Sequence, residues 1–268
     1  MDHNQFFQDL WQDLTLIAPQ AAAIHRALSD AGETVHNDHV AFRTLNRSPV
    51  NLDQLERHIL GFGYEALADY QFPHKHLRAR AYLLPGAPRI FLSELILDEL
   101  SEQSQRVLDR CVSQVDSSMF NDPTCFYAGR PWDPLTFTEY AQLAMESEYG
   151  AWVAALGYHA NHFTVSVNHL NTLCSVEAVL EFVEQLGYSV NSSGGRVKGS
   201  RALLLEQGST LADRLAVQFA DGTHVIPTCY SEFAQRYFDG QGRLYEGFVT
   251  DSADRIFEST HLNPRSPD

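Results

Sequence analysis

The sequence Gly157-Tyr-His-Ala-Asn-His-Phe-Thr-Val-Ser-Val-Asn168 decides the fold, because the chain carries an earlier version of it. That earlier version is Asn37-Asp-His-Val-Ala-Phe-Arg-Thr-Leu45. In each stretch a histidine, His39 or His162, opens a run in which apolar side chains alternate with small or polar ones. This period of two is typical of a half-buried strand. The sequence therefore predicts two equivalent strands, each beginning at a histidine.

The segment that follows each of these strands is repeated too. Helices are predicted at Asn51–Leu60 and Ser175–Leu186, and each is followed by a Gly-Tyr pair, ending at Tyr64 and Tyr188. The tyrosine follows the histidine by 25 residues in the first copy and by 26 in the second. Because internal repetition decides architecture, we predict a strand–helix unit that is used twice.

Each copy continues with further predicted strands, which lie between turn signals. They are Ala79–Leu84 and Arg89–Leu97 in the first copy, and Arg201–Gln207, Leu215–Phe219 and Thr223–Phe233 in the second. We therefore predict an α+β fold in which two βαβββ-like repeat units, residues 33–97 and 157–236, form curved mixed sheets around one site. Added helices complete a single domain of residues 1–268.

Residues 116–150 have no counterpart in the repeat. They are rich in proline and end in a predicted helix, Phe137–Tyr149. A structural insertion or connection is the preferred interpretation, and a lid over the site is the alternative. Other helices are predicted at Met1–Ala18, Ala21–Ala31 and Asp98–Val115, and the tail Arg243–Thr260 is expected to pack back on the core.

Composition limits the classes of partner. The chain has 34 acidic and 19 basic residues, for a formal charge of −15, and 44% of its residues are apolar. The apolar content is enough for a sizeable core. The negative charge disfavours binding to nucleic acid or to an anionic membrane surface. If the substrate is an anion, the few arginines near the site must recognise it.

No targeting or membrane-spanning signal is visible in the sequence. The N-terminal helix is amphipathic with acids between its apolar residues, and no stretch approaches the roughly 20 apolar residues of a membrane span. Four cysteines are widely spaced without a C-x-x-C pair, which argues against a zinc ribbon and favours reduced thiols. We expect a cytoplasmic protein. A homodimer is compatible with this fold, although no residue specifies one.

The repeated histidines indicate a metal site. Two histidines and one carboxylate, with open coordination positions, form the ligand set of mononuclear non-haem Fe(II) and related enzymes. Paired units bring equivalent strands together, so His39 and His162 are expected to converge. Glu232, near the end of the last predicted strand, is placed to complete the triad. Its competitors are Glu94, Glu206, Glu246 and Glu258.

A structural role is the alternative for each histidine. A lone histidine at a strand start is more often hydrogen-bonded than metal-bound, and only the equivalence across the repeat favours ligands. The weaker candidates are a His74-x-His76 pair, which is expected in an exposed loop, and His36 and His159, which precede the principal histidines by three residues. Those two either support the ligands by hydrogen bonds or lie on the surface.

An arginine lies on the same predicted strand face as the first histidine. Arg43 follows His39 by four positions, so both side chains point to one side of a regular strand. A guanidinium there would clamp a substrate carboxylate, and an ordinary salt bridge is the alternative. Arg201 is a lesser candidate for a second substrate carboxylate. The chain has no G-x-S-x-G, G-x-G-x-x-G or P-loop sequence, which argues against serine hydrolases and nucleotide enzymes.

These features together resemble a known family, the metal-dependent 2-oxoadipate dioxygenase/decarboxylases, of the vicinal oxygen chelate fold. The resemblance spans nearly the whole chain. It rests on the segments 37–44, 157–164, 227–233 and 256–260, which read Asn-Asp-His-Val-Ala-Phe-Arg-Thr, Gly-Tyr-His-Ala-Asn-His-Phe-Thr, Pro-Thr-Cys-Tyr-Ser-Glu-Phe and Ile-Phe-Glu-Ser-Thr. The chain is shorter than better-known members between the two histidine strands.

The resemblance implies that His39, His162 and Glu232 bind the metal and that Arg43 is the catalytic arginine that contacts the 2-oxoacid. It implies Fe(II), or another divalent metal, as cofactor, and a small anionic 2-oxoacid and dioxygen as substrates of a single catalytic domain. The expected reaction converts 2-oxoadipate to 2-hydroxyglutarate and carbon dioxide. Two alternatives remain at this point: a metal-dependent isomerase, lyase or hydrolase of the same fold, and a non-catalytic module that binds a small ligand.

Overall fold

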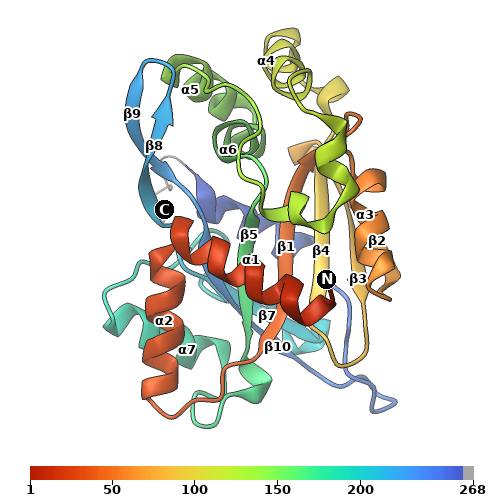
Figure 1. The fold of residues 1–268 in the computed structure, drawn as a ribbon. Coiled ribbons are helices and arrows are strands. Elements are labelled where there is room, and N and C mark those ends of the chain that lie inside the picture. Colours follow the sequence, from red (N-terminus) through yellow and green to blue (C-terminus); the bar gives the residue numbers. More distant parts are fainter. Residues whose placement is uncertain (262–268) are drawn as a thin grey trace.

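One curled eight-stranded sheet runs through the protein (Figure 1). The computed structural model describes residues 1–261. The strand order of the sheet is β2-β3-β4-β1-β5-β10-β7-β6. The strands are β1 (Asn37–Leu45), β2 (Glu65–Phe72), β3 (Leu77–Leu83), β4 (Arg89–Leu95), β5 (Ala160–Ser166), β6 (Lys198–Ser200), β7 (Leu205–Ser209) and β10 (Tyr230–Arg236). Two more strands, β8 (Arg214–Phe219) and β9 (Gly222–Pro227), form a separate hairpin.

The sheet is built from two units with the same internal arrangement. In the first, β1 is followed by the helix α3 (Leu52–Gly61) and pairs in parallel with β4, which pairs antiparallel with β3. In the second, β5 is followed by α7 (Val176–Gln185) and pairs in parallel with β10, which pairs antiparallel with β7. The two units join where β1 pairs antiparallel with β5. The α+β fold of paired βαβββ-like units is therefore confirmed.

The helices begin where the sequence indicates. The side chain of Asn51 accepts a hydrogen bond from the backbone of Gln54 and caps α3, and Ser175 caps α7 in the same way. Such caps satisfy amide groups that the first helical turn leaves free. The helix that follows the central strand therefore begins at a side-chain cap in both units.

Strand β2 was not predicted, because its sequence lacks a buried face. It is the edge strand of the sheet, and all but two of its residues, Tyr70 and Phe72, are exposed. Half-buried alternation is the signal that identifies a strand from sequence, and an exposed edge strand does not provide it.

Two of the strands that were predicted have the wrong bounds. The predicted strand Thr223–Phe233 is divided into β9 and β10, because Pro227 cannot donate a ladder hydrogen bond and ends the hairpin strand. The predicted strand Arg201–Gln207 begins as the 3₁₀ helix η6 (Arg201–Leu203), and β7 starts only after Leu204, whose φ of 61° is left-handed.

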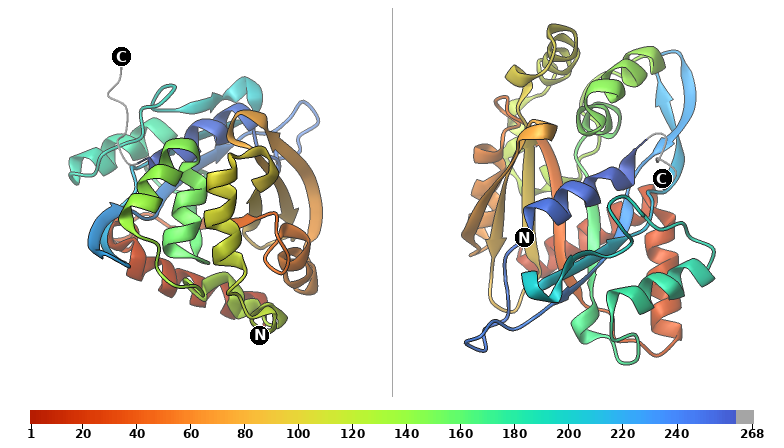
Figure 2. Two further views of the ribbon diagram at one scale, coloured as in Figure 1. Left: turned by 90° about the horizontal axis from the view of Figure 1, so that it is seen from above. Right: turned by 180° about the vertical axis from the view of Figure 1, so that it is seen from behind.

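Helices cover both faces of the sheet. Helix α1 crosses one face in Figure 1, and α8 crosses the opposite face, as seen from behind in Figure 2. The remaining α-helices are α1 (His3–Ile17), α2 (Pro19–Asp30), α4 (Glu102–Val112), α5 (Phe137–Glu146), α6 (Glu148–Leu156) and α8 (Thr250–Ile256). The other 3₁₀ helices are η1 (Pro73–Lys75), η2 (Leu97–Glu99), η3 (Ser117–Asn121), η4 (Pro123–Tyr127), η5 (Val167–His169) and η7 (Phe257–Thr260).

The structure places the predicted helix Phe137–Tyr149 and the tail Arg243–Thr260 against the core. The region around 137–149 divides into α5 and α6, and every residue of α6 except Glu148 is buried, so α6 is a core element. The tail packs back as predicted, because α8 contacts β2, β6 and β7. It therefore covers the face of the sheet that lies opposite α1.

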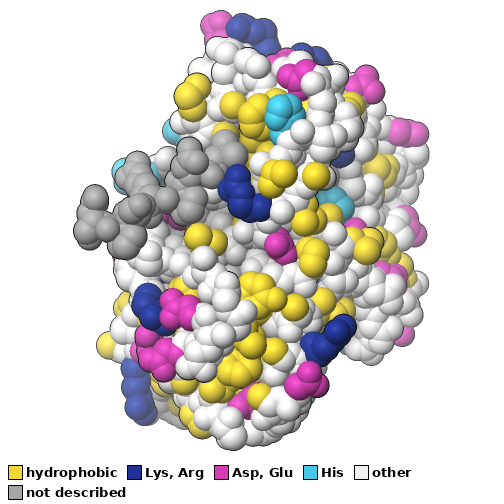
Figure 3. Space-filling view, turned by 90° about the vertical axis from the view of Figure 1, so that its left-hand side faces the viewer, with side chains coloured by type: hydrophobic (Ala, Val, Ile, Leu, Met, Phe, Trp, Pro, Cys, Tyr) yellow, Lys and Arg dark blue, Asp and Glu magenta, His cyan; other side chains and the backbone are white. Residues whose placement is uncertain are grey.

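Charged side chains of both signs are mixed on one face of the molecule, and the cysteines are unpaired with one another. On the face shown in Figure 3, the Lys and Arg side chains are scattered among acidic ones and do not gather into one basic patch. All four cysteines are free thiols. Within residues 1–261, none of the helices combines the length and apolar character that crossing a membrane requires.

Gly157, in the turn from α6 into β5, is a residue that alanine should not replace. Its φ is +80°, and a Cβ there would lie 2.2 Å from the Gly129 carbonyl oxygen. A clash with backbone cannot be relieved by a rotamer change, so Gly157→Ala is expected to lower the free energy of unfolding by more than about 3 kcal/mol. Gly32 is the matched control. Its φ is +87°, and a Cβ added there would meet no atom within 4 Å, so Gly32→Ala should cost about 1 kcal/mol. Urea unfolding of both variants tests this, and equal losses would contradict it.

Candidate metal site

The register of three neighbouring strands gathers the predicted ligands on one face of the sheet. His39 lies opposite Thr164 on β5, and Thr164 lies opposite Glu232 on β10. Two residues further along β1, Ala41 lies opposite His162. Residues directly opposite each other, and residues two apart on one strand, share a face. The two histidines and the glutamate therefore point to the same side, which is the side covered by α8.

The distances within this group suit a single divalent ion. Nε2 of His162 lies 3.1 Å from one carboxylate oxygen of Glu232, and Nε2 of His39 lies 3.6 Å from the other. One ligand atom from each residue falls within 4.8 Å of the others, and all three side chains are buried. Bonds of about 2.1 Å to a metal place adjacent ligand atoms about 3 Å apart. Within residues 1–261 no other group of three His, Cys, Asp or Glu residues meets this criterion.

The electrostatics of the group favour the protonation states that a cation needs. Burial raises the pKa of Glu232, but His162, His39 and a hydrogen bond from Gln207 outweigh it and hold the pKa below its usual value. Burial is also the largest influence on His162, whose pKa is lowered. An ionised carboxylate and a neutral imidazole are the forms that bind metal. The pKa shifts of Glu232 and His162 are both in the direction that favours these forms.

The residue that precedes each histidine fixes its ring. Nδ1 of His39 lies 2.8 Å from a carboxylate oxygen of Asp38, and Nδ1 of His162 lies 3.1 Å from the amide oxygen of Asn161. Each Nδ1 therefore carries the proton and donates it, because neither oxygen can donate. In the neutral form of each ring, the lone pair of Nε2 is then free for a metal on the side of Glu232, and Nε2 of His39 also lies 3.0 Å from the Thr164 hydroxyl.

The group lies in a small cavity of about 20 Å³. A cavity of this size holds an ion or about one water molecule. Phe248 and residues of α8 and η7 close it on the side away from the sheet. The full lining is His39, Ala41, Phe91, His162, Gln207, Tyr230, Glu232, Phe248, Ala253, Ile256 and Phe257.

Sequence reasoning missed two polar residues of this lining. Gln207 donates a 2.6 Å hydrogen bond to Glu232. Tyr230 stacks on the ring of His162 with centroids 4.6 Å apart, and its buried hydroxyl has no hydrogen-bond partner among residues 1–261. Burial raises the pKa of Tyr230 well above its usual value, so the hydroxyl keeps its proton. Tyr230 precedes Glu232 by two positions, and that spacing was the signal that places both on the same face.

Arg43 is close to the site but already engaged. Its guanidinium donates to Glu148 at 3.1 Å and to Thr260 at 2.9 Å, and in the described part of the chain only Nε lacks a partner. Burial lowers the pKa of Arg43, but Glu148 outweighs it and the net shift is upward. Its guanidinium carbon lies 4.9 to 5.8 Å from the ring centres of Tyr149, Trp152 and Phe257. Arg43 is not among the residues that line the cavity.

Arg201 is not brought to the site. It is exposed on η6, and its guanidinium lies 5.3 Å from the ring centre of Tyr237. The left-handed turn at Leu204 separates it from the strand that carries Gln207. The prediction that a strand begins at Arg201 is therefore wrong.

The competing carboxylates, and the competing histidines other than His74, have partners elsewhere in the structure. Glu94 pairs with Arg78, and Glu206 accepts from Tyr237. Glu246 pairs with Arg89, and Glu258 accepts from Ser193. The partners of the weaker histidine candidates are Glu99 for His76, Asp13 for His159 and the ring of His169 for His36, whereas His74 lies in the exposed η1 segment.

A buried lysine, Lys198, was not singled out by the sequence. It is 3% exposed and donates to the backbone carbonyls of Asn191 and Arg196. Within the described part of the chain no carboxylate pairs with it directly, and Glu232 and Glu258 attract it only from a distance. It lies opposite Gln207 in the β6–β7 pairing, next to the cavity lining. Burial lowers its pKa to about 8.

Paired βαβββ units with two histidines and a glutamate at the sheet centre indicate a class, the mononuclear metal enzymes. The family model of the 2-oxoadipate dioxygenase/decarboxylases matches residues 10–130 and 125–243. The match covers most of the chain, so this protein belongs to the 2-oxoadipate dioxygenase/decarboxylase family.

Solved structures agree with this assignment. The hydroxyglutarate synthase of Oryza sativa, solved in complex with 2-oxoadipate, is 32% identical, with a TM-score of 0.92 over 97% of this chain and 92% of that protein. A Shewanella frigidimarina protein, provisionally described as a hydrolase, is 45% identical, with a TM-score of 0.88 over 93% and 98%. A Ralstonia eutropha protein provisionally placed in the glyoxalase superfamily is 21% identical, with a TM-score of 0.77 over 91% and 84%, which shows the shared fold alone.

The poorly compensated ammonium of Lys198 generates a prediction about stability. Replacing such a buried ion by an apolar side chain is often stabilising, so Lys198→Met should raise the free energy of unfolding at pH 7 by up to about 2 kcal/mol. The folded-state pKa of about 8 lies below the usual lysine value of 10.5, which holds in the unfolded chain. Between pH 8 and pH 10.5 the unfolded wild type therefore binds more protons than the folded wild type. The free energy of unfolding of the wild type rises with pH in this range, so the stability gained by Lys198→Met shrinks.

Urea unfolding at pH 7 and pH 9.5 measures this difference, with Lys75→Met as control. The Lys75 ammonium lies near Asp254 and Glu258 at a less buried position. A loss of stability in Lys198→Met at pH 7 would contradict the description of Lys198 as a poorly compensated buried charge.

Proposed function

We propose that this protein is an Fe(II)-dependent dioxygenase that oxidatively decarboxylates 2-oxoadipate to 2-hydroxyglutarate. The observation that carries the proposal is the buried group of His39, His162 and Glu232 in a chain of this family. The 2-oxoadipate bound to the rice relative supports the substrate. Atoms balance without a further co-substrate, because 2-oxoadipate and dioxygen together equal 2-hydroxyglutarate and carbon dioxide.

The three side chains fit the cofactor. Two neutral imidazoles and one carboxylate leave open positions on a six-coordinate ion and suit Fe(II), and the same set also accepts other divalent metals. When bound, Fe(II) supplies dioxygen activation and polarisation of the keto group. The protein supplies the fixed rings, the ionised Glu232 and the enclosure that excludes bulk water.

Binding of the substrate needs positive charge and donors. In our proposal Arg43 provides the field for the 2-oxoacid carboxylate, with Nε as its one unpartnered donor. The hydroxyl of Tyr230 lines the cavity without a partner and donates to a substrate oxygen. Both groups are buried, so each gains more from a charged partner than it would in water.

The second carboxylate of 2-oxoadipate needs a cation other than Arg201. Lys198 is the candidate that we propose, because it is buried next to Gln207 and no carboxylate of residues 1–261 forms an ion pair with it. A dicarboxylate in the site would provide the missing negative charge. A buried ammonium without an ion-pair partner lowers the stability of the fold, and in our proposal it is present because it binds an anionic substrate.

The substrate requires the cover of the cavity to move. A six-carbon diacid cannot occupy the cavity of about 20 Å³ that Phe248 and η7 leave over the metal ligands. In our proposal the segment that carries Phe248 shifts away to admit the substrate and closes behind it. Closure of this kind separates the reaction from water.

The main test is dioxygen consumption by protein reconstituted anaerobically with Fe(II) and then given 2-oxoadipate. We expect uptake matched by release of carbon dioxide and formation of 2-hydroxyglutarate. Glu232→Ala removes a ligand and should lower the rate by more than about 100-fold, beyond the loss typical of a supporting residue. Glu206→Ala, on the neighbouring strand but bonded to Tyr237, is the matched control and should keep its activity.

Each outcome separates the alternatives. Turnover without dioxygen would indicate an isomerase, lyase or hydrolase of the same fold. Ligand binding that persists in His39→Ala, with no bound metal in the wild type, would indicate a non-catalytic module. Full activity of Glu232→Ala would reject Glu232 as a ligand.

A prediction about substrate specificity follows from Lys198. Lys198→Met should raise the KM for 2-oxoadipate by about 10- to 100-fold, the range of one charged hydrogen bond. It should change little the KM for 2-oxohexanoate, which has the same chain length without the second carboxylate. Arg201→Met should alter neither value. Equal effects of Lys198→Met on both substrates would contradict a contact with the distal carboxylate.

A further inference from the structure

The two histidines of the proposed metal site are supported by different chemistry at equivalent positions of the repeat. The residue before His39 is Asp38, a carboxylate, whereas the residue before His162 is Asn161, a neutral amide. Both accept a hydrogen bond from Nδ1 of the histidine that follows. Only the first support carries a charge.

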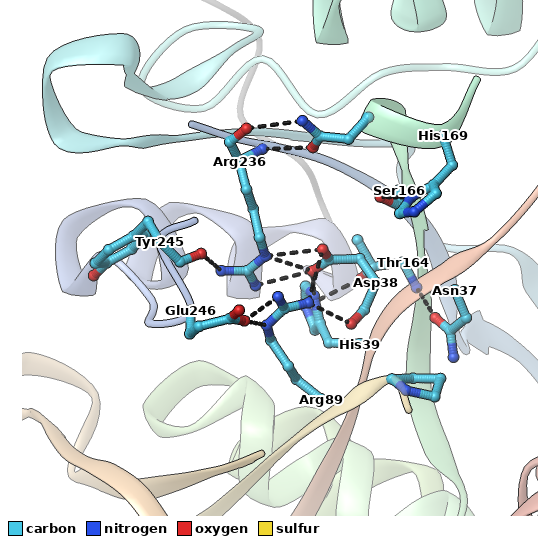
Figure 4. Close-up of polar contacts among 12 residues, drawn as sticks. Asn37, Asp38, His39, Arg89, Thr164, Ser166, His169, Arg236, Tyr245 and Glu246 are labelled. Carbon is cyan, nitrogen blue, oxygen red and sulfur yellow. Dashed lines mark hydrogen bonds and ion pairs between the residues drawn. The ribbon is translucent and has the colours of Figure 1, made fainter. Parts of the chain in front are cut away.

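That charge is held by a buried arginine from β10. Nε of Arg236 donates to both carboxylate oxygens of Asp38, at 2.8 and 3.1 Å, and Nη2 donates at 2.9 Å. Arg89 adds a longer contact of 3.3 Å to the same carboxylate. Asp38 and Arg236 are only 3% and 2% exposed. Figure 4 shows the carboxylate of Asp38 between the two guanidinium groups and His39.

The same arginine also holds the segment that leads to the cover of the cavity. Nη1 of Arg236 donates to the carbonyl oxygens of Tyr245 and Gly247, at 3.1 and 2.7 Å. The next residue, Phe248, lines the cavity, and its ring centre lies 4.8 Å from that of His39. A single chain of contacts therefore runs from the ring of His39 through Asp38 and Arg236 to the cover.

We propose that Asp38 and Arg236 are positioning residues that hold His39 for the metal and tie the segment 245–248 to it. This inference rests on the proposed metal site. A carboxylate that accepts from Nδ1 keeps the proton there, orients Nε2 and makes it a better donor to a metal. Arg236 keeps Asp38 in place with three hydrogen bonds, which fixes the ring through two steps. His39 is then the strongly held ligand, and His162, with its amide support, is the weakly held one.

Metal affinity is the readout that a purely structural ion pair would not change. We would titrate the purified metal-free protein with Co(II), whose absorption bands report the ligand field, and compare it with Asp38→Asn. This isosteric change gives the first histidine the same support as the second. The dissociation constant should rise about 10- to 100-fold, as for other outer-sphere carboxylates. Asn161→Ala, which removes the neutral support of His162, should raise it less.

Asp38→Asn leaves Arg236 buried without its partner, so a second variant separates loss of stability from loss of support. The double variant Asp38→Asn/Arg236→Gln removes both charges and should recover stability relative to the single variant, because no charge of this pair is then left buried without its partner. Its Co(II) affinity should stay weak. A double variant that binds Co(II) like the wild type would overturn the proposal, as would Asp38→Asn with unchanged affinity.

The link to the cover has its own readout. Arg236→Gln should speed hydrogen exchange of the backbone amides of residues 245–248 in the metal-free protein, because two carbonyl contacts are lost. Unchanged exchange there would overturn this part of the proposal. These measurements distinguish failure of the proposed function from failure of this inference. A wild type that binds no Co(II) would reject the metal site itself. Normal binding by both the wild type and Asp38→Asn would reject only the positioning role.

Discussion

The antiparallel pairing of β1 with β5 at the centre of the sheet is the constraint on which the site depends. Among residues 1–261 it is the strand pairing that joins the two units, and it sets the register in which Ala41 lies opposite His162. A shift of one residue would turn every side chain of one strand to the other face. His162 would then point toward the face that α1 covers, away from Glu232. The fold and the site are thus decided by the same set of hydrogen bonds.

Burying so many ionisable groups in an acidic protein is costly, and the structure offsets that cost by pairing. Asp38 is surrounded by Arg236, Arg89 and His39, and its pKa is held below its usual value although burial raises it. Glu232, by contrast, is contacted by two imidazoles and the amide of Gln207. A divalent cation would complete the charge balance at that point. Charge balance and the geometry of the side chains therefore both favour a divalent cation between His39, His162 and Glu232.

The sequence predicted which side chains meet at the sheet centre better than it predicted their surroundings. His39 and His162 were chosen as candidate ligands because the repeat makes them equivalent, and Glu232 because the family resemblance singled it out among several carboxylates, and the structure brings the three together. The bounds of the strand that carries Glu232 were wrong, since Pro227 divides it, but the strand itself was expected.

What sequence reasoning missed was non-local. Lys198 and Gln207 are adjacent only through the β6–β7 pairing, and Phe248 reaches the site because Arg236 holds its segment. Arg201 was misplaced because a left-handed turn at Leu204 carries no sequence signal in a non-glycine residue.

The position of the metal itself is the most direct test of the site. Crystals of the Fe(II)-loaded protein, grown anaerobically, would be measured at the iron absorption edge. We expect one strong anomalous peak within about 2.2 Å of Nε2 of both ligand histidines and a carboxylate oxygen of Glu232. A peak at another group of side chains, or loaded crystals with no peak between these three, would contradict the assignment.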